Sequence, residues 1–170
     1  MSDQYHISCP HLGPCGLALV ININKITRIS EVEGKEEKVE REGSQEDKKK
    51  MTDLFHFLNF EVDVKEDLTR HDILKAIIDF SEKLQNNSYD ICAVCIMSHG
   101  DNNLIEGSDG NMVNIEKDIF HKLSNDYCRS MTGKPKFFVF QACRGRKKDA
   151  GYLAKSAATR ATTDAPGAPQ

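Results

Sequence analysis

The sequence predicts an α/β fold in which an open, mostly parallel β-sheet carries helices on both faces. Two patterns predict this fold. Short apolar runs that are typical of buried strands alternate with longer stretches whose apolar residues recur at helical spacing. A Ser or Thr followed three residues later by an acidic residue precedes two of those stretches, as at the start of a helix. Strands that alternate with helices are joined by crossovers, which make the strands parallel.

The composition excludes several classes of protein. A chain of 170 residues with 39% hydrophobic residues can bury one core without disulfides or metals. Its net charge of −3 argues against nucleic acid as a partner. The apolar runs are much shorter than the ~18 residues of a membrane span, and the N-terminus does not have a signal-peptide pattern. The six scattered cysteines are therefore expected to be free thiols in a reducing compartment.

The first strand is expected at residues 16–23, where GLALVINI is a short apolar run with β-branched members. Residues 24–41 are heavily charged and are expected to form a long solvated loop. At Ser44 the stretch SQED has the pattern of a capping box, so a helix is expected to begin there. The apolar residues at helical spacing in this stretch are Met51, Leu54, Phe55 and Leu58.

A second strand is expected at residues 60–64, where FEVDV alternates, and TRHD at residues 69–72 predicts the start of a second helix. The apolar residues of that helix are Ile73, Ala76, Ile77, Phe80 and Leu84. ICAVCIM at residues 91–97 predicts a buried third strand, which is followed by a polar, Gly-rich loop at 98–114 and a helix at 115–123.

Pro135 precedes the fourth expected strand, KFFVF. From residue 154 onward the chain is poor in large apolar residues and rich in Ala, Thr, Pro and Gly, which is typical of disorder. We therefore expect one catalytic region at residues 1–153 and a disordered linker at 154–170. If KFFVF ends the sheet, an apolar strand lies at an open edge, an arrangement that soluble proteins avoid. The hypothesis is an incomplete domain whose edge another polypeptide covers.

Two reactive side chains follow neighbouring strands of this sheet. His99 comes directly after the third strand, and Cys143 directly follows the fourth. Binding and reactive groups of open parallel sheets gather beyond the carboxyl ends of the strands, so the imidazole and the thiol are expected at one rim. An imidazole can take the proton of a thiol and return it to a leaving amine, which predicts acyl transfer. The backbone N–H groups of Gly100 and Cys143 are candidates to hold the oxyanion.

These residues lie in motifs that resemble those of caspases. QACRG around Cys143 matches the caspase signature, with SHG around His99 upstream of it. The stretches GLALVINI, REGSQED and TGKPK extend the likeness over nearly the whole chain. The sequence is similar to a caspase large subunit of the executioner type.

The resemblance implies a cysteine peptidase that cleaves after aspartate and acts in apoptosis. Cys143 would be the nucleophile and His99 the base, with the oxyanion held by the backbone of Gly100 and Cys143. The resemblance assigns substrate binding to three residues: Arg41, Gln141 and Ser98. A guanidinium donates in bidentate fashion to a carboxylate, which suits the assignment of Arg41 to an aspartate pocket.

The resemblance also implies partners and processing. Caspase large subunits pair with a small subunit, and two such heterodimers associate, so this chain alone is expected to be inactive. Caspases are zymogens cut after aspartate between the subunits, and here Asp164 is the expected site, with Asp149 as the alternative. Protein substrates, a cytoplasmic location, and the absence of cofactor, metal, nucleic-acid partner and membrane contact complete the expectation.

Other functions compete with this interpretation. A truncated, non-catalytic chain could bind true caspases through its open sheet edge. A metacaspase-type peptidase would use the same Cys/His pair but cleave after Arg or Lys, and Arg41 argues against that specificity.

The pair Cys92 and Cys95 suggests metal binding, yet residues three apart on a strand point to opposite faces, which favours core packing. The basic stretch at residues 144–148 contains no aromatics and is expected to be a solvated loop.

Overall fold

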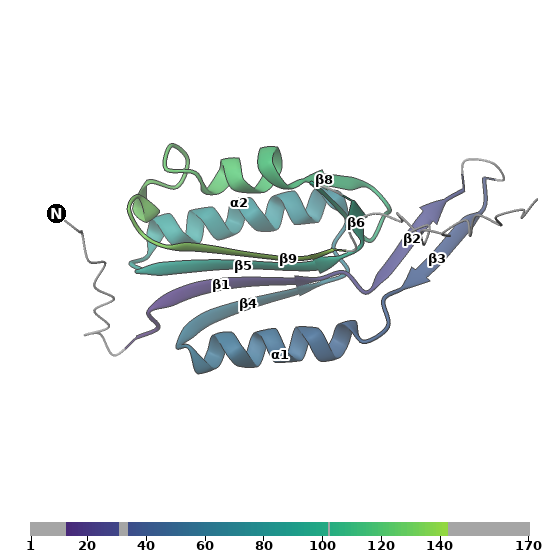
Figure 1. Cartoon of the computed structure of the whole chain (residues 1–170). Coiled ribbons are helices and arrows are strands. Elements are labelled where there is room, and N and C mark those ends of the chain that lie inside the picture. Colours follow the sequence, from purple (N-terminus) through teal and green to yellow (C-terminus); the bar gives the residue numbers. More distant parts are fainter. Residues whose placement is uncertain (1–12, 31–33, 102, 143–170) are drawn as a thin grey trace, which may run out of the picture.

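The computed structural model describes residues 13–30, 34–101 and 103–142. Within them a parallel four-stranded sheet has the order β4-β1-β5-β9. The strands are β1 (Gly16–Asn22), β4 (Phe60–Glu66), β5 (Ile91–Ser98) and β9 (Lys136–Ala142). Helix α1 (Ser44–Phe57) covers one face, and α2 (Arg70–Asn86) covers the other (Figure 1). The predicted open parallel α/β fold is confirmed.

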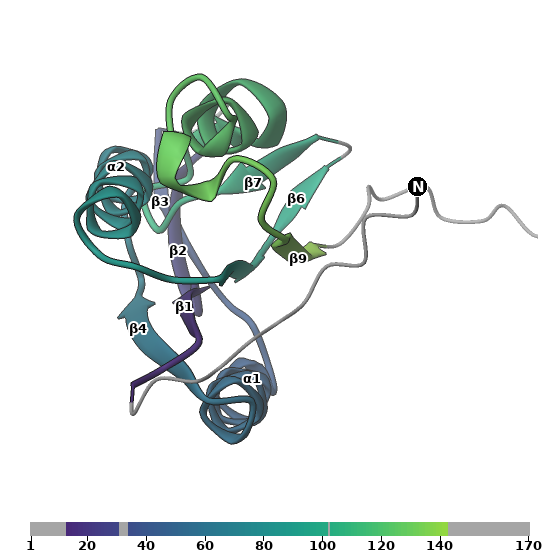
Figure 2. The ribbon, with the colours of Figure 1, turned by 90° about the vertical axis from the view of Figure 1, so that its left-hand side faces the viewer.

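The two central strands form the middle of the core. Every residue of β1 and β5 is buried, as their apolar sequences predict. Isoleucines and leucines of β1, such as Leu19 and Ile21, pack with Ile77 of α2 on one side of the sheet. Val20 packs on the other side with Phe55 of α1. The end-on view in Figure 2 shows α1 and α2 on opposite sides of the strands.

The start of α2 follows the prediction, but the start of α1 does not. Thr69 caps α2, and its side chain accepts a hydrogen bond from the N–H of Asp72. The expected capping box at Ser44 is wrong, because Gly43, with φ of 78°, occupies the N-cap and has no side chain to cap with. Ser44 is instead buried, and its hydroxyl donates to the Oδ1 atom of Asn24 at 2.6 Å.

The expected solvated loop at residues 24–41 is a second correction. Strands β2 (Lys25–Ile29) and β3 (Glu36–Glu40) pair there in an antiparallel hairpin, which extends beyond the carboxyl ends of the central strands (Figure 1). Ile26 is the one fully buried side chain of the described hairpin strands. Because the other positions are charged or partly exposed, the segment lacks the apolar alternation by which strands are predicted.

The expected loop at residues 98–114 is also wrong in part. It contains a small antiparallel sheet of β6 (Gly100–Asp101), β7 (Leu104–Glu106) and β8 (Met112–Asn114). Strands of two or three residues are too short to produce a readable period. The helix expected next is present as a π-helical turn, η1 (Ile115–Phe120), followed by a 3₁₀ turn, η2 (His121–Leu123). A further 3₁₀ turn, η3 (Arg129–Met131), precedes β9.

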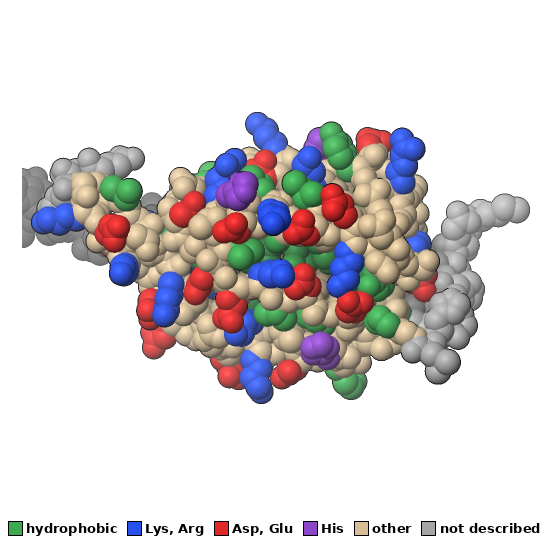
Figure 3. Space-filling model, turned by 180° about the vertical axis from the view of Figure 1, so that it is seen from behind, with side chains coloured by type: hydrophobic (Ala, Val, Ile, Leu, Met, Phe, Trp, Pro, Cys, Tyr) green, Lys and Arg blue, Asp and Glu red, His purple; other side chains and the backbone are tan. Residues whose placement is uncertain are grey.

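None of the helices in the described part of the chain is long and apolar enough to cross a membrane. On the face that Figure 3 shows, Lys and Arg side chains are interspersed with Asp and Glu.

Candidate active site

The carboxyl ends of β5 and β9 bring the expected reactive positions to one edge of the sheet. Ser98, the last residue of β5, is the register partner of Ala142, the last residue of β9. His99 follows the first of these residues, and Cys143 follows the second in the sequence. Cys143 itself lies outside the described residues, as do Asp149, Asp164 and the basic stretch at 144–148.

The surroundings of His99 favour the neutral form of its imidazole. Burial lowers the pKa of His99, and the positive charges of Arg28 and Arg41 lower it further, while the carboxylate of Glu106 acts in the opposite direction. The buried Nε2 atom has no hydrogen-bond partner among the described residues. A neutral imidazole with an unused ring nitrogen can accept a proton, which is the property a general base needs.

Gly100 occupies a position that only glycine fits. A Cβ atom there would lie 2.2 Å from the backbone oxygen of Leu104, closer than any side chain allows. The N–H of Glu106 donates to the carbonyl of His99 at 2.9 Å, so the next pair along the ladder, Gly100 and Ile105, is of the non-hydrogen-bonded kind. The N–H of Gly100 consequently points out of the β6–β7 ladder.

Arg41 lies between the hairpin and α1, at the end of β1. Its Nη1 donates to the side-chain oxygen of Asn22 and to the carbonyl of Ile23, each at 3.2 Å, and its own N–H donates to the carbonyl of Asn24 at 2.9 Å. The positive charge of Arg41 is one of the causes that lower the pKa of His99. Its contacts with Asn22 and Ile23 hold Arg41 at the carboxyl end of β1, the strand that pairs with β5.

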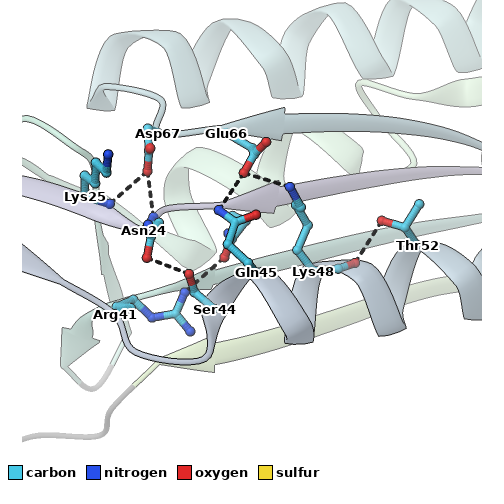
Figure 4. A network of polar contacts seen from close by, with 10 residues as sticks. Asn24, Lys25, Arg41, Ser44, Gln45, Lys48, Thr52, Glu66 and Asp67 are labelled. Carbon is cyan, nitrogen blue, oxygen red and sulfur yellow. Dashed lines mark hydrogen bonds and ion pairs between the residues drawn. The ribbon is translucent and has the colours of Figure 1, made fainter.

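A polar network fixes the segment that holds Arg41 (Figure 4). Asp67 accepts hydrogen bonds from the N–H groups of Asn24 and Lys25 at 2.6 and 2.9 Å. The Asn24 side chain in turn accepts from Ser44, and the first turn of α1 is linked to β4 through Gln45 and Lys48, which both contact Glu66. The network joins β1, the hairpin, α1 and β4 around the guanidinium.

The other two substrate-binding predictions fall on side chains with different surroundings. Gln141 is exposed near the end of β9, and its amide donates to Asp47 of α1 at 3.0 Å. Ser98 is buried, and its hydroxyl donates to the backbone carbonyl of Glu106. Gln141 is thus accessible from solvent, whereas the Ser98 hydroxyl is engaged within the protein.

The sequence reasoning missed Asn22, which contacts Arg41. Asn22 is fully buried at the end of β1, and its Nδ2 atom has no hydrogen-bond partner among the described residues. An amide at the end of an otherwise apolar strand was the available signal, since buried polar side chains are placed for their hydrogen bonds.

It also missed the ion pair between Arg28 of β2 and Glu106 of β7. The guanidinium donates through Nε and Nη2 to the two carboxylate oxygens, each at 2.6 Å. The two residues are 78 positions apart, and no local pattern in the sequence links them.

Nothing in the described part of the chain resembles a metal centre. No three His, Cys, Asp or Glu side chains of the described residues are grouped closely enough to hold a metal ion. Cys92 packs in the core on the α2 side of the sheet and Cys95 on the α1 side, so the prediction that they point to opposite faces is confirmed. Near the N-terminal end of the described residues, the Sγ atom of Cys15 lies 3.5 Å from the carbonyl oxygens of Leu58 and Asn59.

Comparisons with known proteins agree with these motifs. Residues 15–169 match the model of the family described as Caspase domain, peptidase C14. The chain is 34% identical to caspase-3 of Mus musculus over 151 residues, which cover 89% of this chain and 50% of the relative. It is 38% identical to caspase-14 of Mus musculus over 65% of this chain and 44% of the relative. With human caspase-9 the identity is 34% over 91% of the chain and 36% of the relative. The chain spans about half the length of the curated relatives it matches, or less.

Proposed function

The chain belongs to the caspase family, and from that premise we propose that it is the large subunit of a cysteine endopeptidase that cleaves after aspartate. One observation carries the proposal. His99, whose surroundings lower its pKa, directly follows β5 beside the strand end that precedes Cys143, and Arg41 is held at the same end of the adjacent strand β1.

In the proposed reaction, the thiol of Cys143 loses its proton to His99 and attacks the carbonyl carbon of the peptide bond after aspartate. The tetrahedral oxyanion is held by the N–H groups of Gly100 and Cys143. The C–N bond then breaks, and the proton on His99 passes to the leaving amine. Water, deprotonated by the same imidazole, hydrolyses the remaining thioester and releases the acid and the free thiol. No cofactor or metal takes part.

Arg41 is proposed to select the aspartate, with Gln141 as a further donor. The Nη1 contacts to Asn22 and Ile23 hold the guanidinium in place, and a guanidinium can present a fork to a carboxylate. The exposed amide of Gln141 can exchange its contact with Asp47 for one with substrate. For Ser98, which was expected to bind substrate, burial supports a positioning role next to His99.

A small subunit is the proposed partner of the edge strand β9. Within the described residues, β9 is the last strand of the sheet, and its Phe137 and Val139 are 54% and 40% exposed. Together with Met51 of α1 and Leu58 at its C-cap they line an apolar groove. Covering this groove and the edge would remove apolar surface and unpaired backbone groups from water.

The rest of the proposal follows caspase organisation. Two large–small heterodimers would associate, and the precursor would be cut after Asp164, or alternatively after Asp149, in or near the linker at 154–170. A cytoplasmic location and a role in apoptosis are part of the same proposal.

The test is hydrolysis of a fluorogenic peptide that ends in aspartate. The chain alone is compared with the chain extended by the downstream sequence of its precursor, and with the Cys143→Ala variant of the extended protein. We expect hydrolysis only by the extended protein with Cys143 intact. Hydrolysis by the alanine variant would exclude Cys143 as the nucleophile.

A second candidate is a non-catalytic regulator that binds active caspases, which the exposed edge of β9 favours. Adding the chain to an active caspase distinguishes the two functions. A regulator changes the turnover by that caspase even when the added chain carries Cys143→Ala, whereas an enzyme subunit that remains unpaired leaves the turnover unchanged.

A further inference from the structure

We propose that the ion pair between Arg28 and Glu106 is a positioning device of the active site, holding the hairpin that leads to Arg41 against the strands that carry His99. The inference rests on the proposed function, because it assigns the two residues a task in substrate binding and proton transfer. Neither residue belongs to the motifs by which the family resemblance was found.

The buried carboxylate of Glu106 fixes the geometry of the pair from one end, while the side chain of Arg28 is 40% exposed. Glu106 is 2% exposed, and each of its carboxylate oxygens accepts a hydrogen bond of 2.6 Å from the guanidinium of Arg28. A bidentate contact of this kind restricts distance and orientation together. A buried carboxylate needs such a partner, because an uncompensated charge in the interior is costly.

Backbone contacts extend the pair to the residues on either side. The carbonyl of Glu106 accepts from Ser98, and its N–H donates to the carbonyl of His99. On the other side, the N–H of Thr27 donates to the carbonyl of Ser108 at 2.8 Å. Strand β2 therefore lies against the segment after β7, and the ion pair connects this contact to the backbone of the histidine.

The pair also adjusts the charge around the imidazole. Three described groups act on His99: Arg28 from β2, Arg41 beyond the end of β3, and Glu106 from β7. The two cations disfavour the protonated imidazole, and the carboxylate favours it. Removing the charge of Arg28 should therefore raise the pKa of His99, and removing the charge of Glu106 should lower it.

Three variants separate charge from geometry. Glu106→Gln removes the negative charge, Arg28→Gln removes the positive charge, and Arg28→Lys keeps the charge but loses the planar fork. Glu61→Gln is the matched control, since Glu61 also accepts a 2.6 Å contact from a cation, Lys83, but has no described effect on His99.

Two measurements are made on each variant. The pKa of His99 is followed by NMR in the chain itself. The KM and the acidic limb of kcat/KM are measured in the extended enzyme with a peptide ending in aspartate. We expect Glu106→Gln to lower the pKa of His99 and to move the acidic limb to lower pH, and Arg28→Gln to do the reverse. Arg28→Lys should raise KM about tenfold, the size of one lost charged contact, with little change in the titration.

Different results would refute this inference and the proposed function. The inference would be overturned if folded Arg28→Gln and Arg28→Lys both kept the pKa of His99 at the parent value and the KM within twofold of the parent value. If Glu106→Gln does not fold, the pKa of His99 and the KM of the two Arg28 variants are sufficient to test the inference. If the parent extended protein cleaves no Asp peptide, the proposed function fails, and opposite shifts of the His99 titration would still establish that the pair acts on the histidine.

Discussion

At the scale of single residues, burial determines which thiols can react. Burial is the largest cause of the raised pKa of Cys92, which is about 12, and burial also raises the pKa of Cys95 to about 11. Since the thiolate is the reactive form, these side chains carry less than about a hundredth of the thiolate of an ordinary cysteine at neutral pH. The two thiols are therefore structural, and a metal or redox role for CAVC finds no support in their surroundings.

We predict that alkylation of the native chain with limiting iodoacetamide modifies Cys143 first and leaves Cys92 and Cys95 unmodified. Peptide mass spectrometry measures the rate at each site, and Cys143→Ser removes the fast site as a control. Equal rates at Cys92 and Cys143 would contradict both the burial argument and the assignment of the nucleophile.

His99 makes the stability of the fold depend on pH. Its pKa is lower in the folded chain than the unfolded value of about 6.5, because burial and the two arginines disfavour its charged form. The folded state therefore binds fewer protons than the unfolded state, and stability must fall as the pH drops below that value. We expect His99→Gln to lose less stability than the parent between pH 7 and pH 5 in urea unfolding. Identical losses would show that the imidazole does not titrate differently in the two states.

Arg41 provides a test of specificity at the same scale. Arg41→Lys keeps a positive charge but removes the fork that fits a carboxylate. We expect kcat/KM of the extended protein for Asp peptides to fall at least about a hundredfold, which corresponds to roughly 3 kcal/mol of lost binding in the transition state. Glu36→Gln, on the exposed part of the same hairpin, is the control. Turnover close to that of the parent in Arg41→Lys would exclude Arg41 from the aspartate pocket.

At the scale of elements, the side chains at the starts of α1 and α2 have different roles. Thr69 caps α2 through a hydrogen bond from Asp72, whereas Ser44 makes no cap and contacts Asn24. We expect Thr69→Ala to lower the free energy of unfolding by about 1 kcal/mol without changing substrate binding. Ser44→Ala should instead raise KM, because it loosens the network around Arg41. Urea unfolding and peptide kinetics of both variants measure this, and the reverse assignment of effects would refute it.

The same elements show what a sequence can and cannot predict. β1 and β5 were predictable because short, continuous apolar runs are typical of strands that are buried on both faces. The hairpin β2–β3 was not, because Ile26 is its one fully buried residue among the described positions, and β6–β8 were too short. In the site, His99 and Arg41 lie in recognisable motifs. Arg28 and Glu106 meet across 78 positions, and such a contact exists only once the chain is folded.

At the scale of the whole molecule, β9 is apolar on both of its sides. On the α2 side, Phe120 packs edge-on against Phe138 and Phe140, with ring centroids 4.6 and 5.9 Å apart. On the α1 side, Phe137 and Val139 remain exposed beside the helix. An edge strand with apolar surface on both sides needs a partner that continues the sheet and also covers its faces, and a small subunit would do both.

Charges placed on this edge should therefore weaken subunit association while leaving the fold intact. Val139→Lys puts an ammonium group into the groove beside α1, where it would be desolvated by a bound partner. With the small subunit supplied as a separate chain, we expect the concentration that gives half-maximal Asp-peptide hydrolysis to rise about tenfold or more, and maximal activity to be recovered at high concentration. Val64→Lys is the matched control, since Val64 is a partly exposed valine on β4, at the opposite end of the sheet. If both lysines shift the titration equally, the partner does not bind at β9. If neither does, activity does not depend on covering this edge.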